Sequence, residues 1–236
     1  MIINFNDKLK EVCNSIEIDI NNEQIEQLNL FKELLLAWNE KMNLTAIVDE
    51  HEIIAKHFLD SMIPAHLFSE GNVIDVGTGA GFPILPLKIL KPQLEVYGLD
   101  ALNKRILFLK EVSKELGVNL NLIHGRAEDY AKKDVSRETF KYATARAVAP
   151  LNILAEYNLP FLKIGGEFIA YKGSNYKDEL NESEKALELL GGKVKKIYDY
   201  KVPIVEEDKY AIVIEKIDNT PTRYPRKPGI PKKRPL

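Results

Sequence analysis

Cysteine is nearly absent from the 236-residue sequence, which holds only Cys13. One thiol excludes an intramolecular disulfide framework, a four-cysteine zinc site and paired-thiol redox chemistry, so we expect a reducing compartment. No apolar run approaches the ~20 residues that span a bilayer, and the first residues, MIINFNDKLKEVC, lack the apolar core of a signal peptide. The sequence therefore predicts a cytoplasmic protein without a membrane segment.

Histidine is also scarce. The four histidines, His51, His57, His66 and His124, do not have the spacing of zinc ligands. His57 and Asp60 are three positions apart on a predicted helix, where a local hydrogen bond is the ordinary interpretation. We expect no metal site.

Charge is nearly balanced in total but not along the chain. The 33 basic and 35 acidic residues give a net charge of −2, yet residues 221–236, PTRYPRKPGIPKKRPL, carry six basic groups and no acidic one. Removing those six leaves about −8 on the rest of the chain. A basic segment on an acidic body acts as a local patch that attracts phosphate.

The spacing of hydrophobic residues and the positions of structure-breaking residues divide the chain into three parts. Residues 1–70 have helical spacing, with Asn21 and Gln24 expected to form a capping box and a second helix expected over 50–67. Residues 71–218 alternate strand-like and helix-like segments. Residues 219–236 hold five of the 12 prolines, a density that argues against helix and interior strand.

The central part predicts a mostly parallel sheet of seven strands. Five apolar runs separated by helical stretches indicate parallel strands with crossover helices. They cover residues 73–76, 94–99, 120–123, 142–145 and 167–170. Two further segments, 193–200 and 210–217, have no helix between them and should pair antiparallel. The expected fold class is α/β, Rossmann-like, with an antiparallel last strand and an N-terminal helical extension.

A glycine-rich loop, in VIDVGTGAGFP, follows the first predicted strand. Gly77, Gly79 and Gly81 allow a tight turn whose backbone N–H groups can approach a ligand. A dinucleotide fingerprint has glycine at the sixth position, where this sequence has Phe82. The GxGxG spacing instead resembles the S-adenosylmethionine loop of class I methyltransferases. A tight turn without a ligand is the alternative.

Acidic residues follow the next two strands at the same edge of the sheet. Asp100 ends the second strand, where a carboxylate can accept ribose hydroxyls. Ala127 and Glu128 follow the third strand, where such methyltransferases hold adenine. The structural alternatives are a helix cap for Asp100 and a surface acid for Glu128.

A set of longer strings resembles one family. DVGTGAGFP, KRILFL, RAE, ARAVAP, YKG and YPRKPGIPKKRPL occur in order, with NLTAI and HFLDS upstream, and are similar to ribosomal RNA small-subunit methyltransferase G, also called glucose-inhibited division protein B. The resemblance implies S-adenosylmethionine-dependent methylation of guanine nitrogen 7 in the 16S rRNA hairpin near the decoding centre. It also implies cofactor contacts for Gly77, Phe82, Ala127, Glu128 and Arg146.

The residues suit nitrogen 7 better than two other targets. Methylation of cytosine carbon 5 needs a cysteine nucleophile, and Cys13 is far in sequence from the strand ends. Methylation of an exocyclic amine usually employs an Asn/Asp-Pro-Pro-aromatic segment after the fourth strand, where this chain has ATARAVAP. Guanine nitrogen 7 already has an in-plane lone pair, so alignment can carry the catalysis.

Three residues at strand ends are candidates for positioning the substrate, and none is assigned as a catalytic base. Arg146 can bind a methionine carboxylate, a guanine edge or a phosphate, or form a structural salt bridge. Tyr171 and Lys172 can stack on and fix a flipped base, with a plain strand end as the alternative.

The tail supplies the expected RNA contacts: Arg223, Tyr224, Arg226, Lys227, Lys232, Lys233 and Arg234. Basic groups neutralise phosphates and an aromatic ring stacks on bases, whereas a disordered solubilising end is the alternative. Deletion of residues 221–236 is then expected to weaken RNA binding and to spare donor binding.

We expect a monomer that acts on 16S rRNA or the small-subunit particle. The rival functions are a methyltransferase for another RNA, a protein or a small molecule, and a non-catalytic assembly factor.

Overall fold

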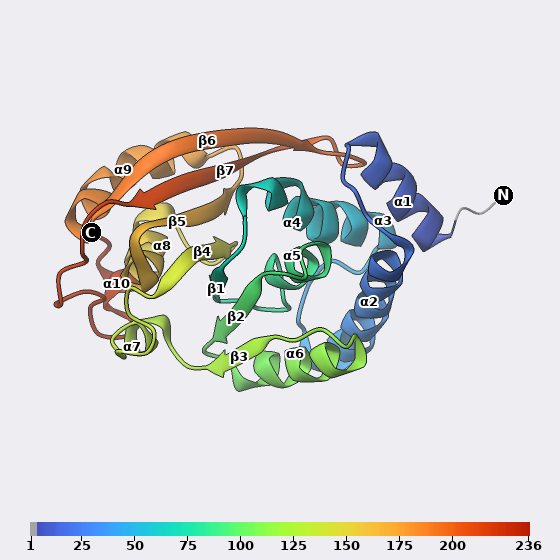
Figure 1. Cartoon of the computed structure of the whole chain (residues 1–236), viewed down its shortest axis with the longest axis horizontal. Coiled ribbons are helices and arrows are strands. Elements are labelled where there is room, and N and C mark those ends of the chain that lie inside the picture. The colour runs from blue at the N-terminus through green and yellow to red at the C-terminus, as the bar shows by residue number, and fades with distance from the viewer. Residues whose placement is uncertain (1–3) are drawn as a thin grey trace.

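One seven-stranded sheet forms the centre of the structure, a computed structural model that describes residues 4–236 (Figure 1). The strands are β1 (Asn72–Val76), β2 (Glu95–Asp100), β3 (Asn121–His124), β4 (Phe140–Arg146), β5 (Leu162–Lys172), β6 (Gly192–Val202) and β7 (Glu207–Lys216). They lie in the order β3-β2-β1-β4-β5-β7-β6, and β7 runs antiparallel to both of its neighbours. The predicted mostly parallel sheet with an antiparallel last strand is confirmed.

Helices cover both faces of this sheet and make three layers. The helices that follow strands are α5 (Ile84–Leu90), α6 (Asn103–Glu115), α7 (Ala127–Tyr130), α8 (Leu151–Asn158), with the short η3 (Leu159–Phe161) after it, and α9 (Tyr176–Leu190). Neighbouring strand residues point to opposite faces. Val73 and Tyr142 therefore pack with α5 and α6, whereas Ile74 and Ala143 pack with α8 and α9.

The N-terminal part is helical, as predicted. Its first two helices are α1 (Phe5–Ser15) and α2 (Asn22–Met42). The predicted capping box is present, since the Gln24 N–H donates to the Asn21 side chain and the Asn21 N–H donates to that of Gln24.

The expected helix over residues 50–67 is present but irregular. It consists of α3 (Glu50–Glu52), the π-helical η1 (Ile53–Leu59), α4 (Asp60–Met62) and the 3-10 segment η2 (Ile63–Leu67). Wide π turns inside helices concentrate at functional sites. Here the wide turn contains His57.

Aromatic rings join the N-terminal helices to the residue that follows the glycine loop. The ring centroid of the fully buried Phe31 lies 5.0 Å from that of Phe82, 5.8 Å from Phe58 and 6.5 Å from Phe108. Aromatic pairs at such distances contribute about 0.5–1.5 kcal/mol each beyond area burial. This packing holds the N-terminal helices against the loop.

The segment after β7 returns along the face of the sheet that α8 and α9 cover, and it includes α10 (Ile230–Lys233) (Figure 1). The expectation that its prolines exclude a helix is wrong for these four residues. Pro231 lies in the first turn of α10, where a missing N–H breaks no helical hydrogen bond. Across residues 4–236, the helices are too short or too polar to cross a bilayer.

Candidate functional site

Two adjacent clefts open at the carboxyl ends of the parallel strands. Between β1 and β4 the strand order reverses, which is where ligands bind in open α/β sheets. The smaller cleft, of about 150 Å³, is lined by the end of β1 and the residues following β2 and β3; we refer to it as the glycine-loop cleft. The larger one, of about 580 Å³, is lined by η1 and the ends of β4 and β5, and we refer to it as the arginine cleft. Val148 lines both clefts.

The glycine loop makes the tight turn that its residues predict. Gly77, Gly79 and Gly81 have φ values of +81°, +59° and +93°, a region that disfavours side chains. A Cβ atom on Gly77 would also lie 2.9 Å from a methyl group of Val148. The loop thus brings its backbone close to the junction of the two clefts.

Asp100 ends β2 with its carboxylate held by three donors. Oδ2 accepts from the Gly79 N–H at 3.0 Å and from the Arg105 guanidinium at 3.1 Å, and Oδ1 accepts from the Leu102 N–H at 2.8 Å. The N-cap residue of α6 is Leu102 rather than Asp100, although two of the three donors to Asp100, Leu102 and Arg105, lie at the start of that helix. The Asp100 carboxylate forms a fixed wall of the glycine-loop cleft.

Glu128 lies in α7 and is only 4% exposed, which excludes the surface-acid alternative. Glu128 Oε1 accepts the backbone N–H of Gly229, from the C-terminal segment, at 3.0 Å. Ala127 begins α7, so its N–H has no partner within the helix. Both residues line the glycine-loop cleft.

Asp75, at the end of β1, is fully buried. The hydroxyl of Thr78 contacts its carboxyl group, and neither side chain has another hydrogen-bond partner within residues 4–236. Burial raises the pKa of Asp75 to about 8. Asp75 and Thr78 are buried beneath the loop and do not line the glycine-loop cleft.

Arg146 ends β4 and lines the arginine cleft. Its guanidinium donates to Asp60 Oδ2 at 2.6 Å and to the Lys56 carbonyl at 3.0 Å, and its Cζ lies 5.2 Å from the ring centroid of Phe82. The Tyr200 hydroxyl donates to Asp60 Oδ1 at 2.9 Å. The salt bridge considered for Arg146 is therefore present, and it fixes the guanidinium at the cleft.

His57 and Asp60 are site residues that the sequence alone does not single out. The hydrogen bond expected between them is replaced by other contacts: the His57 Nε2 lies 2.9 Å from the Thr45 hydroxyl, and Asp60 binds Arg146. The His57 ring stacks on Phe82, with centroids 4.3 Å apart and an interplanar angle of 13°. Burial and the neighbouring Arg146 lower the pKa of His57 to about 3. The signals in the sequence were the string HFLDS, which contains both residues and resembles the family, and their spacing of three positions on a predicted helix.

The two candidates at the end of β5 both line the arginine cleft, and both side chains have little exposed surface. The Tyr171 side chain is only 4% exposed, and its hydroxyl donates to the Ser61 carbonyl at 3.2 Å. Strand alternation turns this ring toward the N-terminal helices, so the structure does not support stacking on a base. Lys172 lines the cleft, with its ammonium 2.5 Å from Glu179 and 3.0 Å from the Ala149 carbonyl.

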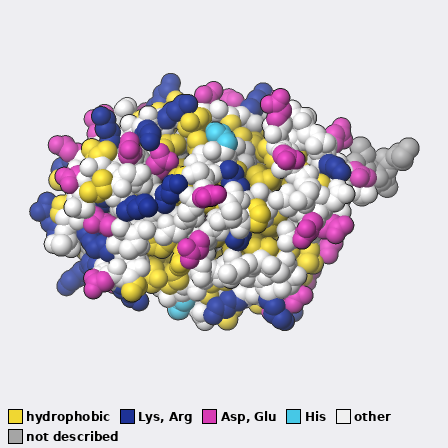
Figure 2. Space-filling view, in the orientation of Figure 1, with side chains coloured by type: hydrophobic (Ala, Val, Ile, Leu, Met, Phe, Trp, Pro, Cys, Tyr) yellow, Lys and Arg dark blue, Asp and Glu magenta, His cyan; other side chains and the backbone are white. Residues whose placement is uncertain are grey.

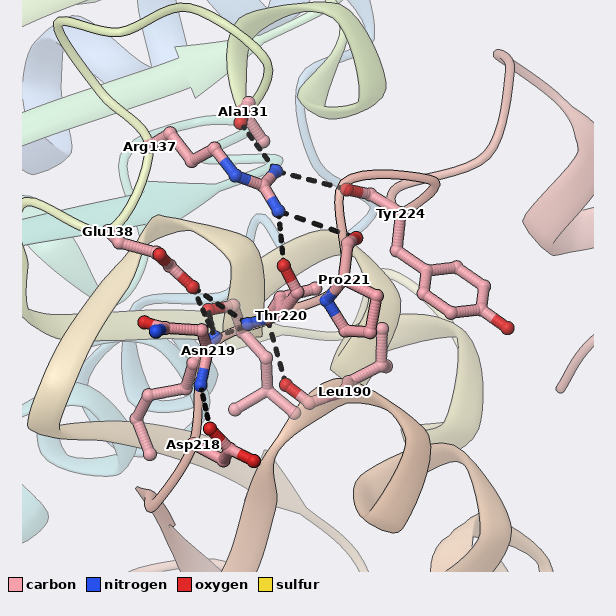
Figure 3. Close-up of polar contacts among 11 residues, drawn as sticks. Ala131, Arg137, Glu138, Leu190, Asp218, Asn219, Thr220, Pro221 and Tyr224 are labelled. Atoms are coloured by element: carbon pink, nitrogen blue, oxygen red, sulfur yellow. Dashed lines mark hydrogen bonds and ion pairs between the residues drawn. The ribbon is translucent and has the colours of Figure 1, made fainter.

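The C-terminal segment is packed rather than extended into solvent. The Arg137 guanidinium donates to the carbonyls of Thr220 at 2.6 Å and Tyr224 at 3.0 Å (Figure 3). Tyr224 is 7% exposed and belongs to a hydrophobic core, which leaves no ring face for the expected base stacking. Arg226 is bound by Glu156.

The other basic candidates remain exposed: Arg223, Lys227, Lys232, Lys233 and Arg234. Figure 2 shows Lys and Arg side chains gathered at the end of the molecule where this segment lies.

The reversed β7, the glycine loop after β1 and the acidic residues after β2 and β3 define a Rossmann-like fold of the class I methyltransferase type. Solved structures share this fold at low sequence identity. One from Bacillus halodurans, described as a candidate methyltransferase, has a TM-score of 0.52 with 14% identity and covers 69% of this chain and 100% of its own. One from Pyrococcus horikoshii, described as a candidate transferase, has a TM-score of 0.55 with 12% identity and covers 68% of this chain and 63% of its own. In the described part of the chain, no three His, Cys, Asp or Glu side chains are grouped to hold a metal ion.

Sequence comparison identifies the family. The GidB family model, rRNA small subunit methyltransferase G, matches residues 24–206. Ribosomal RNA small subunit methyltransferase G of Alkaliphilus metalliredigens is 51% identical over 97% of both chains, and that of Clostridium tetani is 46% identical over 98% of both. The chain belongs to the rRNA small subunit methyltransferase G family, as its motifs predicted.

Proposed function

We propose that this protein transfers a methyl group from S-adenosylmethionine to nitrogen 7 of a guanine in the 16S rRNA of the small ribosomal subunit, in the cytoplasm. The observation that carries the proposal is the meeting of two unlike clefts at Val148. One has the groups that suit a nucleoside-like methyl donor, and the other has room and basic side chains for a nucleotide of RNA. Membership of an rRNA methyltransferase family supports the substrate class.

The glycine-loop cleft suits the donor part by part. Gly77 and Gly79 let the backbone approach it, and Asp100 can accept its ribose hydroxyls. Ala127 and Glu128 offer an N–H donor and a carboxylate acceptor for adenine. S-adenosylmethionine, when bound, provides an electrophilic methyl group on a positively charged sulfur.

The arginine cleft suits the RNA nucleotide. Its volume of about 580 Å³ is within the usual range of ligand sites, roughly 300–1,000 Å³. Lys56, Arg146, Lys172 and Lys209 line it. Each is paired with a carboxylate, and a phosphate would join or replace these pairs. Phe82 lies beneath the Arg146 guanidinium, next to the glycine loop. We infer that Arg146 orients the substrate or the donor carboxylate where the two clefts meet.

The reaction needs alignment more than proton transfer. Guanine nitrogen 7 carries its lone pair in the ring plane, so no side chain has to remove a proton before it attacks the methyl group. Alignment of two reactants can contribute roughly 7–11 kcal/mol. The chain supplies that alignment through Arg146, which Asp60 and Tyr200 hold in place.

The test is incubation with S-adenosylmethionine labelled in the methyl group and three acceptors: small subunits lacking the modification, naked 16S rRNA, and bulk protein. Label is expected in the rRNA of at least one of the first two acceptors. Incorporation into protein alone, or into no acceptor, contradicts the proposal.

Arg146→Ala should lower turnover at saturating donor by more than about 100-fold. Circular dichroism and thermal unfolding would check that the variant folds. Wild-type turnover in that variant removes Arg146 from the site.

A further inference from the structure

A contact between the C-terminal segment and the glycine-loop cleft goes beyond the RNA binding expected of that segment. We call residues 219–236 the C-terminal strap. The Gly229 N–H of the strap donates to Glu128 Oε1 at 3.0 Å. Glu128 is nearly buried and lines the cleft. The strap thus touches a wall of the proposed donor site.

The strap is held in this position by an ion pair just before Gly229. Glu156, on α8, is 0% exposed. It accepts the Arg226 backbone N–H at 2.7 Å, the Nε–H at 2.9 Å and the Nη2–H at 2.6 Å. Three hydrogen bonds to one buried carboxylate fix both the backbone and the side chain of Arg226.

A second group of contacts anchors the start of the strap. The Thr220 N–H donates to Glu138 Oε1 at 2.7 Å, and its hydroxyl donates to the Leu190 carbonyl at 2.8 Å (Figure 3). Arg137, the neighbour of Glu138 in the chain, donates to the Thr220 and Tyr224 carbonyls. Because two anchors precede it, Gly229 meets Glu128 at a defined place.

The conformation of Gly229 depends on its being glycine. Its φ is +81°, and a Cβ added there would meet nothing within 4 Å. Space therefore allows a side chain, whereas the backbone angle disfavours one. This backbone conformation directs the N–H toward Glu128 immediately before α10 begins.

We propose that the strap completes the adenine end of the donor site, with Gly229 as a positioning residue. Its N–H engages one oxygen of Glu128 and so fixes the carboxylate, which presents its other oxygen to the exocyclic amine of adenine. The inference rests on the proposed role of Glu128 in donor binding. It replaces the expectation that deletion of residues 221–236 spares donor binding.

The test compares the full chain with a chain that ends at Arg226. The shortened chain keeps the Arg226–Glu156 pair and the Arg137 contacts but loses the Gly229 N–H. Calorimetry would measure its affinity for S-adenosylhomocysteine and for S-inosylhomocysteine, in which oxygen replaces the adenine amine. The full chain should prefer the adenosyl compound. The shortened chain should bind that compound roughly 10-fold more weakly, as expected for one hydrogen bond to a charged group, and lose much of the preference.

Two controls distinguish the positioning role of Gly229 from the loss of basic charge and from backbone strain. Replacing Lys227, Lys232, Lys233 and Arg234 by Gln removes the basic charges that the shortened chain also lacks but keeps the Gly229 N–H, so donor affinity should stay unchanged. Gly229→Ala is matched by Gly165→Ala, because Gly165 has φ +77° and equally open surroundings. Only Gly229→Ala should reduce the preference for the adenosyl compound.

Unchanged affinity and preference in the shortened chain overturn the inference. An equal loss of affinity for both compounds also overturns it, because that result indicates a loosened fold rather than a misplaced Glu128. If the full chain binds neither compound, the proposed function itself fails. The two failures are therefore distinguishable.

Discussion

Both ends of the chain reach the clefts, but different forces hold them there. The N-terminal helices pack aromatic and aliphatic side chains against the sheet and deliver His57 and Asp60 to the arginine cleft. The C-terminal strap is held through Arg137 and Arg226 as well as by the buried Tyr224 ring, and it delivers Gly229 to the glycine-loop cleft. An apolar attachment is sensitive to lost volume, whereas a buried ionic one is sensitive to the loss of a partner. The two ends should therefore respond to different changes.

The largest effect is expected in the apolar attachment. Phe31→Ala removes a fully buried ring that packs on Phe58, Phe82 and Phe108, and should lower the free energy of unfolding by about 3–5 kcal/mol. Denaturant unfolding measures the loss, with Phe31→Leu as the milder control. A loss below about 1 kcal/mol would show that this cluster does not hold the N-terminal helices.

The ionic attachment is tested by Arg226→Ala. This change leaves the Glu156 carboxylate buried with one backbone donor remaining, and should cost about 3 kcal/mol. The double variant Arg226→Ala/Glu156→Gln should recover part of the loss, because it removes the unpaired charge. Arg223→Ala, at an exposed strap position, should change stability by less than about 0.5 kcal/mol. Equal effects of the Arg226 and Arg223 changes contradict the proposed anchor.

The N-terminal attachment should also weaken in acid. His57 has its pKa lowered from 6.5 to about 3, so between these values the unfolded chain binds a proton that the folded chain does not. The free energy of unfolding should therefore fall as the pH drops from 6.5 toward 3, by up to about 1.4 kcal/mol per pH unit from this group.

The control for the acid effect is His57→Phe, whose stability should lack this part of the slope. Asp75 has a raised pKa, so its contribution to stability falls as the pH rises from 3.8 toward 8. Both proteins share this contribution, and the difference between their curves of unfolding free energy against pH therefore reports His57 alone. Parallel curves for the two proteins would contradict a buried neutral His57.

The smallest effect on stability is expected at the exposed end of the strap. Lys232→Gln/Lys233→Gln should leave the free energy of unfolding within about 0.5 kcal/mol of wild type. RNA affinity should fall, and the slope of log affinity against log salt should become shallower by about 0.7 for each lost phosphate contact. An unchanged slope would show that these two lysines do not contact phosphate.

The sequence predicts those parts of the site that follow directly from strand ends. The glycine loop, Asp100 and Glu128 each come immediately after a strand, and parallel strands bring their carboxyl ends to one edge. Local order in the chain therefore specifies their place. The capping box of α2 is predictable for the same reason, because both partners lie within four residues.

Features that depend on packing between distant segments are not predictable in this way. Asp60 meets Arg146 only because the N-terminal helices pack on the sheet, and Glu156 meets Arg226 only because the strap returns along α8. The orientation of Tyr171 depends on which sheet face its strand position presents, and burial of Tyr224 depends on the strap's anchors. Neither ring could be assigned to the surface or the core from its neighbours in sequence.

The most direct test of the central claim is to map the methylated atom. Small subunits lacking the modification would be incubated with the protein and S-adenosylmethionine, and their rRNA treated with borohydride and aniline, which cleave the chain at 7-methylguanosine. We predict one new cleavage, at a single guanine of 16S rRNA, that depends on both protein and donor. Methyl incorporation without cleavage, or cleavage at many guanines, would contradict a site built to align one guanine nitrogen 7 with the donor.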